Sequence, residues 1–445
     1  MIGSLGLAGC GGSQTERPRP TATVTVAPKP VELTVGLFGA PQEIAAYRQA
    51  VDNYAAAQQQ RVTLTLKTWP SAAAMMTDLA GGAPVPDVFL AGRGDLGVLQ
   101  QDKLIQPVED LLAARNVDLG DAYSREALEA FSSDRHLACM PYAASPEVLY
   151  YNTDLVDFEA MAAAGHDVPN PESGRWSLEQ FAEAVQWAAR PRAGIRAVAL
   201  PADVAGLAPF LYSGHGKVVD DEDAPSTLAF SDPDNQSLWD QLLPILNGPG
   251  VGLTRRELHQ HTPLSWFERG KLAMLVGDRS LVPTLRKHSD LHWDVIALPT
   301  VSDSVTLGDY TGLCMSAATK QTQAAGDLLA YLVSRPAVAL VAQAGFMVPA
   351  STEVGMSDDF LQPTQRPTHA QVFVNAMRSM HVLPIPSTFL ADLDRRTSGL
   401  IGDLFRPGAN VPGLTQQIDA ASQPVLAALD AQLHPSPTPT PTPGG

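Results

Sequence analysis

Apolar and polar positions along the first hundred residues follow the order expected of an α/β protein. Alternation over residues 31–38 predicts a strand, and the amphipathic pattern over 41–59 predicts a helix. Further strands are expected at 61–67 and 87–91, separated by a helix at 72–79 that stops at a pair of glycines. This β-α-β-α-β order predicts a parallel sheet with helices on both of its faces.

The stretch from residue 136 to residue 152 divides the chain. An apolar strand is expected at 136–141, then a break of small residues at 143–146, and then an aromatic-rich strand at 148–152. We expect the chain to cross from one lobe to a second lobe at this break. The other segments of the chain can be read as two lobes arranged around it.

Helices and strands continue to alternate after the break. The clearest helix is expected at 177–190, where Ser177 is a good N-cap and Glu179 lies in the first turn. A third crossing between lobes is expected at 309–316. The other expected elements are strands at 197–200 and 293–298 and helices at 203–211, 233–246, 323–334, 368–380, 389–404 and 413–433.

Several short motifs occur together in the order typical of one protein family. Pro141-Tyr142 is followed by Tyr151–Leu155 (YNTDL), and Phe267, Gly270, Ala273 and Met274 fit the pattern F-x-x-G-x-x-A-M. Each motif is weak alone, and their shared order carries the argument. The chain, over roughly residues 31–430, resembles the extracellular solute-binding proteins of ABC importers, the family that includes maltose-binding protein.

The resemblance implies an α/β fold with two lobes, as in type II periplasmic binding proteins. Mainly parallel sheets with a mixed strand are expected, with a hinge of two to three crossovers. The expected first lobe comprises residues 31–142 plus 265–309, because the F-x-x-G-x-x-A-M motif is interpreted as a return to that lobe. The expected second lobe comprises residues 143–264 plus 310–433.

The function implied by the resemblance is capture of a small polar solute, with a carbohydrate as the best single expectation. Hinge closure would bury the solute, and the closed form would deliver it to the transmembrane subunits of an ABC permease. Neither catalysis nor a cofactor is expected, and the protein is expected to be a monomer. Two alternatives remain open: a ligand-sensing or scaffold lipoprotein on the same fold, and an extracytoplasmic hydrolase with two carboxylates in one cleft.

The expected ligand-binding residues combine aromatic and charged side chains. Aromatic rings stack on sugar rings, and carboxylates and arginines bind hydroxyl or anionic groups. Relatives that bind sugars usually have Gly-Pro-Trp where this chain has Gly277-Asp278-Arg279, so the arginine could select a carboxylate or phosphate, or simply pair with Asp278. The expected site residues are Trp69, Arg93, Asp95, Tyr142, Trp176, Asp278, Arg279 and Tyr310.

Two other patterns point to sites that the surrounding sequence disfavours. Residues 92–97 fit G-x-G-x-x-G, but the helix that follows is very short and no strand ending in an acidic residue comes next, which disfavours a dinucleotide site. His259 and His261 have no third ligand at a suitable spacing, so no metal site is expected. The formal net charge of −17 argues against binding to nucleic acids.

The termini and the cysteines indicate an extracytoplasmic protein. Leu7-Ala8-Gly9-Cys10 resembles a bacterial lipobox, which implies lipidation of Cys10 and attachment to the cell membrane through a lipid anchor. Residues 1–30 are expected to form this lipobox and a disordered tether, and residues 434–445 a Pro/Thr-rich tail. Cys139 and Cys314 could form a disulfide or remain buried thiols.

Overall fold

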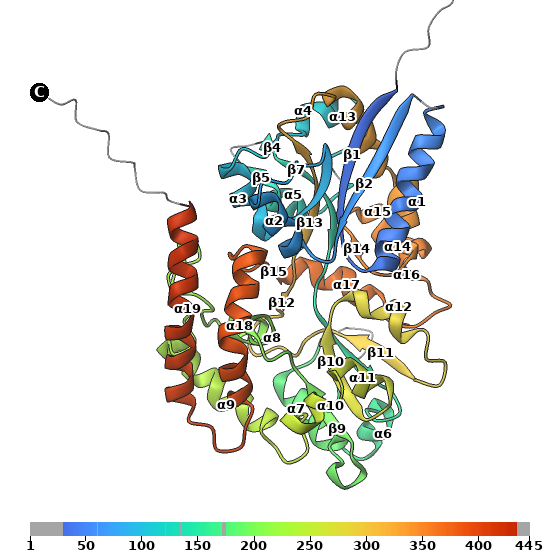
Figure 1. Cartoon of the computed structure of the whole chain (residues 1–445). Coiled ribbons are helices and arrows are strands. Elements are labelled where there is room, and N and C mark those ends of the chain that lie inside the picture. Colours follow the sequence, from blue (N-terminus) through green and yellow to red (C-terminus); the bar gives the residue numbers. More distant parts are fainter. Residues whose placement is uncertain (1–29, 60, 121, 134–135, 171–174, 434–445) are drawn as a thin grey trace, which may run out of the picture.

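The chain folds into two lobes that are connected by several strands of backbone (Figure 1). The computed structural model describes residues 30–59, 61–120, 122–133, 136–170 and 175–433. Cys10, the tether as far as residue 29 and the Pro/Thr-rich tail lie outside the described residues. The two-lobed α/β fold expected from the sequence is confirmed.

The first lobe is built on a mixed sheet. Its strand order is β14-β7-β13-β3-β1-β2, with β4 paired to β13. β1 is parallel to β2 and β3, whereas β13 is antiparallel to β3, β4 and β7. Parallel pairing is therefore confined to the β-α-β-α-β segment that the sequence analysis identified. The strands are β1 (Val31–Phe38), β2 (Val62–Trp69), β3 (Val88–Gly92), β4 (Ile105–Gln106), β7 (Cys139–Ala144), β13 (Tyr310–Ser316) and β14 (Val348–Pro349).

Helices cover the first sheet, and α1 shows how an apolar stripe along a helix is buried against the core. In α1 (Pro41–Ala57) the buried residues include Ile44, Tyr47, Val51 and Tyr54, which lie on one face at helical spacing. The other helices of this lobe are α2 (Ala72–Ala80), α3 (Leu96–Gln101), α4 (Glu109–Ala113), α5 (Arg125–Ala130), α13 (Thr322–Leu332), α14 (Arg335–Gln343), α15 (Thr352–Gly355), α16 (Asp358–Leu361) and α17 (Gln371–Ala376).

The second lobe contains a smaller sheet with the order β11-β8-β10-β9. Its strands are β8 (Val148–Asn152), β9 (Arg196–Ala199), β10 (Leu272–Gly277) and β11 (Trp293–Ile296). β10 runs antiparallel to β8 and parallel to β9, and β11 is antiparallel to β8. Antiparallel pairs therefore predominate here, as they also do in the first sheet, where β14 is antiparallel to β7. The expectation of mainly parallel sheets is wrong for both sheets.

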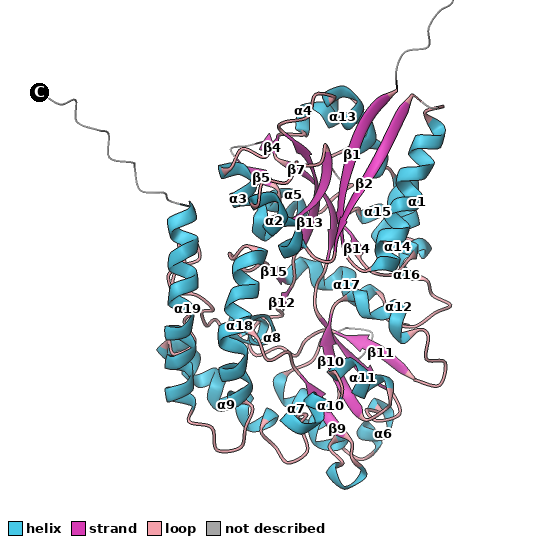
Figure 2. Cartoon of the chain, viewed as in Figure 1, coloured by secondary structure: helices cyan, strands magenta, loops and turns pink. Residues whose placement is uncertain are grey.

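The helices of the second lobe surround this sheet (Figure 2). α7 (Leu178–Ala188) begins with a capping box in which Ser177 and Gln180 exchange hydrogen bonds, as its sequence predicts. The long helices α18 (Ser387–Leu404) and α19 (Val411–Leu433) pack side by side along one edge of the molecule. The others are α6 (Phe158–Ala163), α8 (Val204–Ser213), α9 (Gln236–Leu246), α10 (Arg255–Gln260), α11 (Pro263–Glu268) and α12 (Val282–Leu285).

The structure corrects the expected boundaries of the lobes. Residues 265–309 were expected in the first lobe, but β10 and β11 pair within the second sheet. Residues 310–433 were expected in the second lobe, but β13 and β14 belong to the first sheet. The hydrophobic pattern of a strand predicts that the strand is buried, and it does not specify the sheet in which the strand pairs.

Three segments cross between the lobes side by side. The first is residues 145–147, where Ser145 N–H donates to Asp309 O at 3.0 Å and Glu147 N–H donates to Leu307 O at 2.9 Å. The second contains β12 (Thr306–Leu307), and the third contains β15 (Met380–His381), which pairs parallel with β12. The break at 143–146 and the crossing before β13 were both anticipated from the sequence, whereas the crossing at β15 was missed.

A disulfide joins Cys139 and Cys314, which lie opposite each other on β7 and β13. The chain leaves the first lobe after β7 and returns to it at β13, so the whole of the second sheet lies between the two cysteines. The bond therefore joins the strand that leaves the first lobe to the strand that returns to it.

In the described part of the chain, no single helix is long and apolar enough to span a membrane, although the bent pair α13 and α14 meets the test of length and composition.

Candidate ligand-binding site

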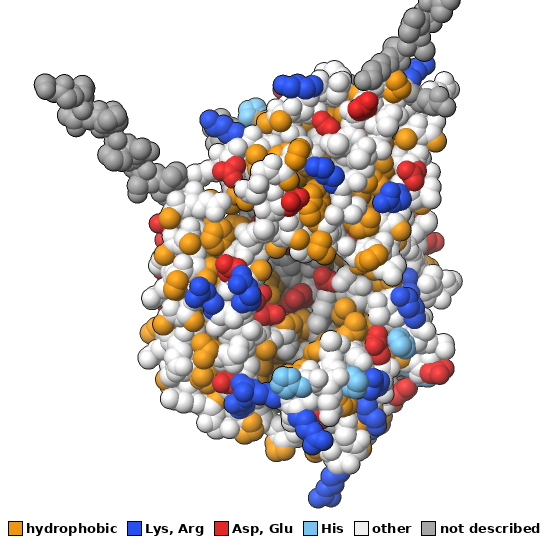
Figure 3. All heavy atoms as spheres, in the orientation of Figure 1, with side chains coloured by type: hydrophobic (Ala, Val, Ile, Leu, Met, Phe, Trp, Pro, Cys, Tyr) orange, Lys and Arg blue, Asp and Glu red, His pale blue; other side chains and the backbone are white. Residues whose placement is uncertain are grey.

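The space between the lobes is bordered by the carboxyl ends of strands from both sheets. On the first lobe, β1 ends just before α1, whose first turn carries Glu43. On the second lobe, β10 ends just before Asp278, and β9 is followed by Asp203 at the start of α8. Open α/β sheets bind ligands at such carboxyl ends. Figure 3 shows a hollow in the middle of this face, where acidic side chains gather.

One pocket of about 340 Å³ lies on the second-lobe side of this hollow, next to the hinge. Two carboxylates line it: Glu147 from the first crossing segment and Asp278 from the end of β10. The rest of the lining is Ala199, Leu200, Pro201, Pro263, Leu264, Leu275, Val276, Gly277 and Leu281.

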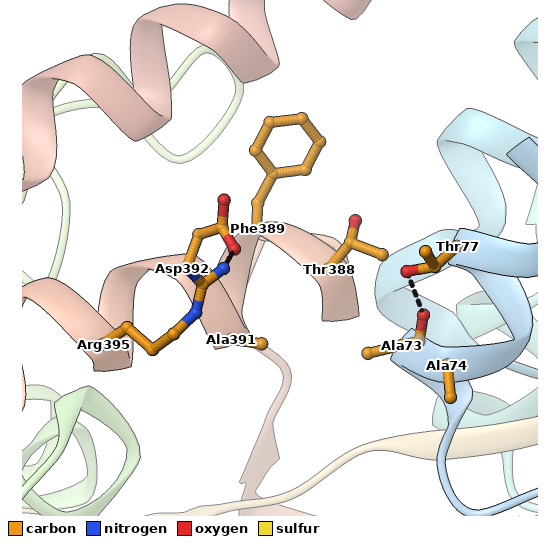
Figure 4. A pocket seen from close by; sticks show the side chains of 8 residues that line it. All are labelled: Ala73, Ala74, Thr77, Thr388, Phe389, Ala391, Asp392 and Arg395. Carbon is orange, nitrogen blue, oxygen red and sulfur yellow. Dashed lines mark hydrogen bonds and ion pairs between the residues drawn. The ribbon is translucent and has the colours of Figure 1, made fainter. Parts of the chain in front are cut away.

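A second pocket, of about 460 Å³, lies where α2 faces α18. Figure 4 shows Ala73, Ala74 and Thr77 of α2 opposite Thr388 and Phe389 of α18. Asp392 and Arg395, which also line it, form an ion pair with each other. Residues of the first lobe and of α18 therefore meet across this pocket, which is less acidic than the hinge pocket.

A third pocket, of about 580 Å³, adjoins the hinge pocket and shares Ala199, Leu200 and Pro263 with it. Its lining includes Arg196 and Arg255, but each is already paired, to Glu257 and Asp403 respectively. The arginines of this pocket therefore do not offer an unpaired cation to a ligand.

Burial strongly perturbs the carboxylates around the hollow. It raises the pKa of Glu43 to about 7, a hydrogen bond from the Ala40 backbone opposes this shift, and the charge of Asp278 adds to it. Burial also raises the pKa of Glu147 well above its usual range, with contributions from the charges of Asp203 and Asp278. These mutual effects connect residues from the first lobe, the hinge and the second lobe in one acidic cluster.

The cluster extends to α18 through Asp394. Burial and then the charge of Asp203 raise the pKa of Asp394 to about 6. Burial likewise raises the pKa of Asp203 and of Asp278, against hydrogen bonds from Gly206 and Ser280 respectively. We call Glu43, Glu147, Asp203, Asp278 and Asp394 the cleft acids. Clustered carboxylates with raised pKa values mark candidate functional sites.

Two further acidic residues, Asp309 and Asp95, form hydrogen bonds at the turn after β3. Asp309 accepts a hydrogen bond from Arg93 N–H at 3.1 Å, and burial followed by the charge of Asp95 raises the pKa of Asp309 to about 7. Asp95 is itself buried and accepts hydrogen bonds from Ser387. The carboxylate of Asp95 therefore joins the turn to the start of α18. Its expected contact with ligand remains a prediction.

Three aromatic residues of the expected site lie in the packed core. Trp176 is 3% exposed, its Nε1 donates to Ala297 O at 2.8 Å, and its ring contacts Phe158 and Phe181. Tyr142 and Tyr310 are 2% and 3% exposed. Neighbouring side chains cover all three rings in this structure, which does not favour the expected stacking on a ligand, and their contact with a ligand remains a prediction.

Arg279 is the clearest correction. The residue is fully buried, its guanidinium lies 4.1 Å from the centre of the Phe360 ring, and Nη2 donates to Phe360 O at 2.8 Å. It turns away from Asp278, and the described structure contains no ion pair between the two. The salt bridge with Asp278, one of the two sequence-based interpretations, is therefore not formed in this structure, and selection of an anionic ligand by Arg279 remains a prediction.

Three expected residues retain access to solvent. Asp278 lines the hinge pocket. Trp69 is partly exposed at the end of β2, where its Nε1 donates to Asp78 of α2 at 3.1 Å. Arg93 is partly exposed in the turn after β3. Contact of these three side chains with a ligand remains a prediction.

Sequence reasoning missed four of the cleft acids. Two of them carry local signals, since Asp203 is the first residue of an expected helix and Glu147 follows the small-residue break. Glu43 and Asp394 lie on amphipathic helices, where an acidic residue usually faces water. Their approach to one another depends on the arrangement of the two lobes, which the pattern of a single element does not encode.

The comparisons with known proteins agree with this architecture. The family model described as bacterial extracellular solute-binding protein matches residues 49–368. The chain belongs to this family. Membership of this extracellular family implies an extracytoplasmic location. The members of the family are binding proteins rather than enzymes. No curated protein matches the chain by sequence.

Solved structures of other solute-binding proteins share the fold. An ABC substrate-binding protein from Listeria monocytogenes in complex with cycloalternan has a TM-score of 0.73 at 16% identity, over 90% of this chain and 99% of that chain. The GacH receptor of Streptomyces glaucescens, studied with acarbose, has a TM-score of 0.68 at 17% identity, over 91% and 98%. The maltose-maltodextrin binding protein of Alicyclobacillus acidocaldarius has a TM-score of 0.65 at 16% identity, over 88% of this chain and 100% of that chain.

Proposed function

We propose that this protein captures a small polar solute, of the carbohydrate class, in the cleft between its lobes. It then presents the solute to the transmembrane subunits of an ABC permease. Attachment to the membrane through lipidated Cys10 would keep the binding protein close to that permease.

The observation that carries this proposal is that carboxylates from both lobes and from the hinge lie near enough to raise one another's pKa values. Glu43 comes from the first lobe, Asp278 from the second lobe and Glu147 from the hinge between them. A ligand that contacts all three gains its full set of interactions only when the lobes are close together. Such differential contact favours the closed conformation.

The hinge supports the same proposal. The three crossing segments are short and hydrogen-bonded to one another, so relative motion of the lobes is confined to a few backbone positions. Closure about such segments is a common way for binding proteins to enclose a ligand. The sugars bound by solved relatives, cycloalternan and acarbose among them, agree with a carbohydrate-class solute.

A thermal-shift screen of the full chain tests the proposal. The panel comprises neutral sugars, amino sugars, polyols, amino acids and organic acids. A ligand at about 100 times its dissociation constant stabilises the folded state by about 2.7 kcal/mol, which raises the melting temperature measurably. We expect at least one carbohydrate or polyol to do so.

Variants locate the binding site of any compound that stabilises the chain. Asp278→Asn should abolish most of the shift, whereas Asp52→Asn, a change at an exposed position of α1, should leave it intact. Stabilisation by organic acids alone, or a shift that Asp278→Asn does not reduce, would count against a polar-solute site in the cleft.

A further inference from the structure

The hinge pocket contains carboxylates that nothing in the described structure neutralises. Oε2 of Glu147 is shielded from solvent and has no hydrogen-bond partner. Asp278, which also lines the pocket, accepts hydrogen bonds from the backbone N–H and the hydroxyl of Ser280. Apart from these two residues, the lining is apolar or backbone. A buried carboxylate in such surroundings is costly unless a partner compensates it.

No cation of the described chain supplies that compensation. None of the ion pairs between described residues involves a cleft acid. Arg279 and Arg286, whose charges act on the neighbouring Tyr150, donate instead to backbone carbonyls of Phe360 and Arg366. Nη2 of Arg279 and Nε of Arg286 therefore bind backbone of α16 and of the segment that follows it, and neither arginine forms an ion pair with a cleft acid.

We propose that the solute captured by this protein carries a protonated amine, which binds between Glu147 and Asp278 in the hinge pocket. This inference rests on the proposed function and narrows its ligand to hydroxyl-rich organic cations such as amino sugars. The amine supplies the missing countercharge, and the hydroxyl groups of the same solute bind the remaining cleft acids.

The geometry favours an organic cation over the other charged ligands. Among the described residues, no three His, Cys, Asp or Glu side chains lie close enough together to hold a metal ion. An anionic group is excluded from a pocket with two carboxylates by like-charge repulsion. The pocket volume of about 340 Å³ and its apolar walls suit the carbon skeleton of a small organic molecule.

The raised pKa values give the inference a distinctive consequence. The charge of Asp278 acts on Glu43 of the first lobe, the charge of Asp203 acts on Glu147 and Asp394, and the Tyr150 hydroxyl donates to the backbone O of Asp278. Without ligand, part of this cluster holds protons near neutral pH. A cation favours the ionised carboxylates, so its binding should release protons and its affinity should rise with pH. A neutral sugar that accepts hydrogen bonds from protonated carboxyls would show the opposite trend.

Calorimetric titration of the full chain with matched probes tests the inference. The probes are D-glucose and its amino-deoxy derivatives, in which one hydroxyl is replaced by an amine. We expect at least one derivative to bind about tenfold or more tightly than D-glucose, because the charged amine interacts with carboxylates at low effective dielectric constant. Its affinity should increase between about pH 5.5 and pH 7.5, with protons released into the buffer.

Variants of the pocket separate this inference from the proposed function. Glu147→Gln, or Asp278→Asn if the first variant does not fold, should remove the preference for the amine, and Asp52→Asn should preserve it. Equal or tighter binding of D-glucose would overturn the amine inference while leaving the proposed function standing. A lack of binding by every probe, charged or neutral, would contradict both.

Discussion

The carboxylate of Asp95 accepts hydrogen bonds from both the backbone N–H and the hydroxyl of Ser387, at 2.8 and 2.9 Å. Asp95 belongs to the turn after β3 in the first lobe, and Ser387 is the first residue of α18, which packs on the core of the second lobe. This buried contact therefore connects the two lobes at a point separate from the hinge. An acidic group at a helix N-terminus also interacts favourably with the helix dipole.

Loss of this contact should destabilise the protein. Asp95→Ala leaves the Ser387 N–H without its acceptor, and we expect the free energy of unfolding to fall by about 1–3 kcal/mol in denaturant titrations. Ser387→Ala removes only the hydroxyl and should cost less. If Asp95→Ala unfolds at the same denaturant concentration as the unaltered chain, the contact does not stabilise the arrangement of the lobes.

Arg279 should contribute to packing and not to ligand choice. Burial lowers its pKa to about 10, and both Nε and Nη1 lack hydrogen-bond partners. Replacement of a buried, incompletely satisfied charge by an apolar residue of similar length is often neutral or stabilising. Arg279→Met should therefore keep the stability within about 1 kcal/mol and leave ligand affinity unchanged.

The cavity left by Arg279→Ala should instead cost about 2–5 kcal/mol, as for other large buried side chains. Chemical denaturation of the two variants measures the difference. A specific loss of ligand binding in a fully folded Arg279→Met variant would show that the arginine acts in the cleft after all.

The ligand-free protein should become less stable as the pH rises through the weakly acidic range. The pKa of Glu43 is about 7 when folded, above its usual value of about 4.3, so the folded state binds more protons than the unfolded state between these limits. The free energy of unfolding should therefore decrease from about pH 4.5 to pH 7 and level off above it.

Glu43→Gln should remove part of this decrease, roughly 1–3 kcal/mol, whereas Asp52→Asn should not. Thermal unfolding of the three proteins across this pH range provides the measurement. If the free energy of unfolding instead rises steadily over this pH range, salt bridges and not buried carboxyls dominate the pH dependence of stability.

The disulfide should stabilise the first lobe substantially. Cys139 and Cys314 are separated by 175 residues in sequence, and cross-links that close long loops restrict the unfolded chain most. A double Cys→Ala variant at these positions should lose about 2–5 kcal/mol. Reductant should lower the melting temperature of the unaltered chain and leave that of the variant unchanged, and equal responses in both would show that the bond has no stabilising effect.

Much of the fold follows from local patterns in the sequence. The alternation at residues 31–38, the stripe along α1 and the capping residue Ser177 are each decided by neighbours within a few positions, and their elements appear as expected. The assignment of β10 and β13 to sheets failed because it depends on contacts between distant parts of the chain. The third crossing at β15 was missed because two paired residues leave almost no pattern in the sequence.

The site was less predictable than the fold. Aromatic residues were favoured because sugars stack on rings, but Trp176 and Tyr142 fill the core, where large apolar surfaces are most stabilising. The acids that do converge, such as Glu43 and Glu147, are separated by more than a hundred residues and are common in type. Only the folded arrangement shows that they share one hollow and lack countercharges.

Hydrogen exchange measured by mass spectrometry, with and without a compound that stabilises the chain, tests the central claim most directly. Ligand bound between the lobes should slow exchange together in three segments: the start of α1 near Glu43, the hinge around Glu147 and the end of β10 near Asp278. The rest of both lobes should change little. Protection confined to one lobe, or located at the pocket around Arg255, would contradict capture of the solute in the cleft.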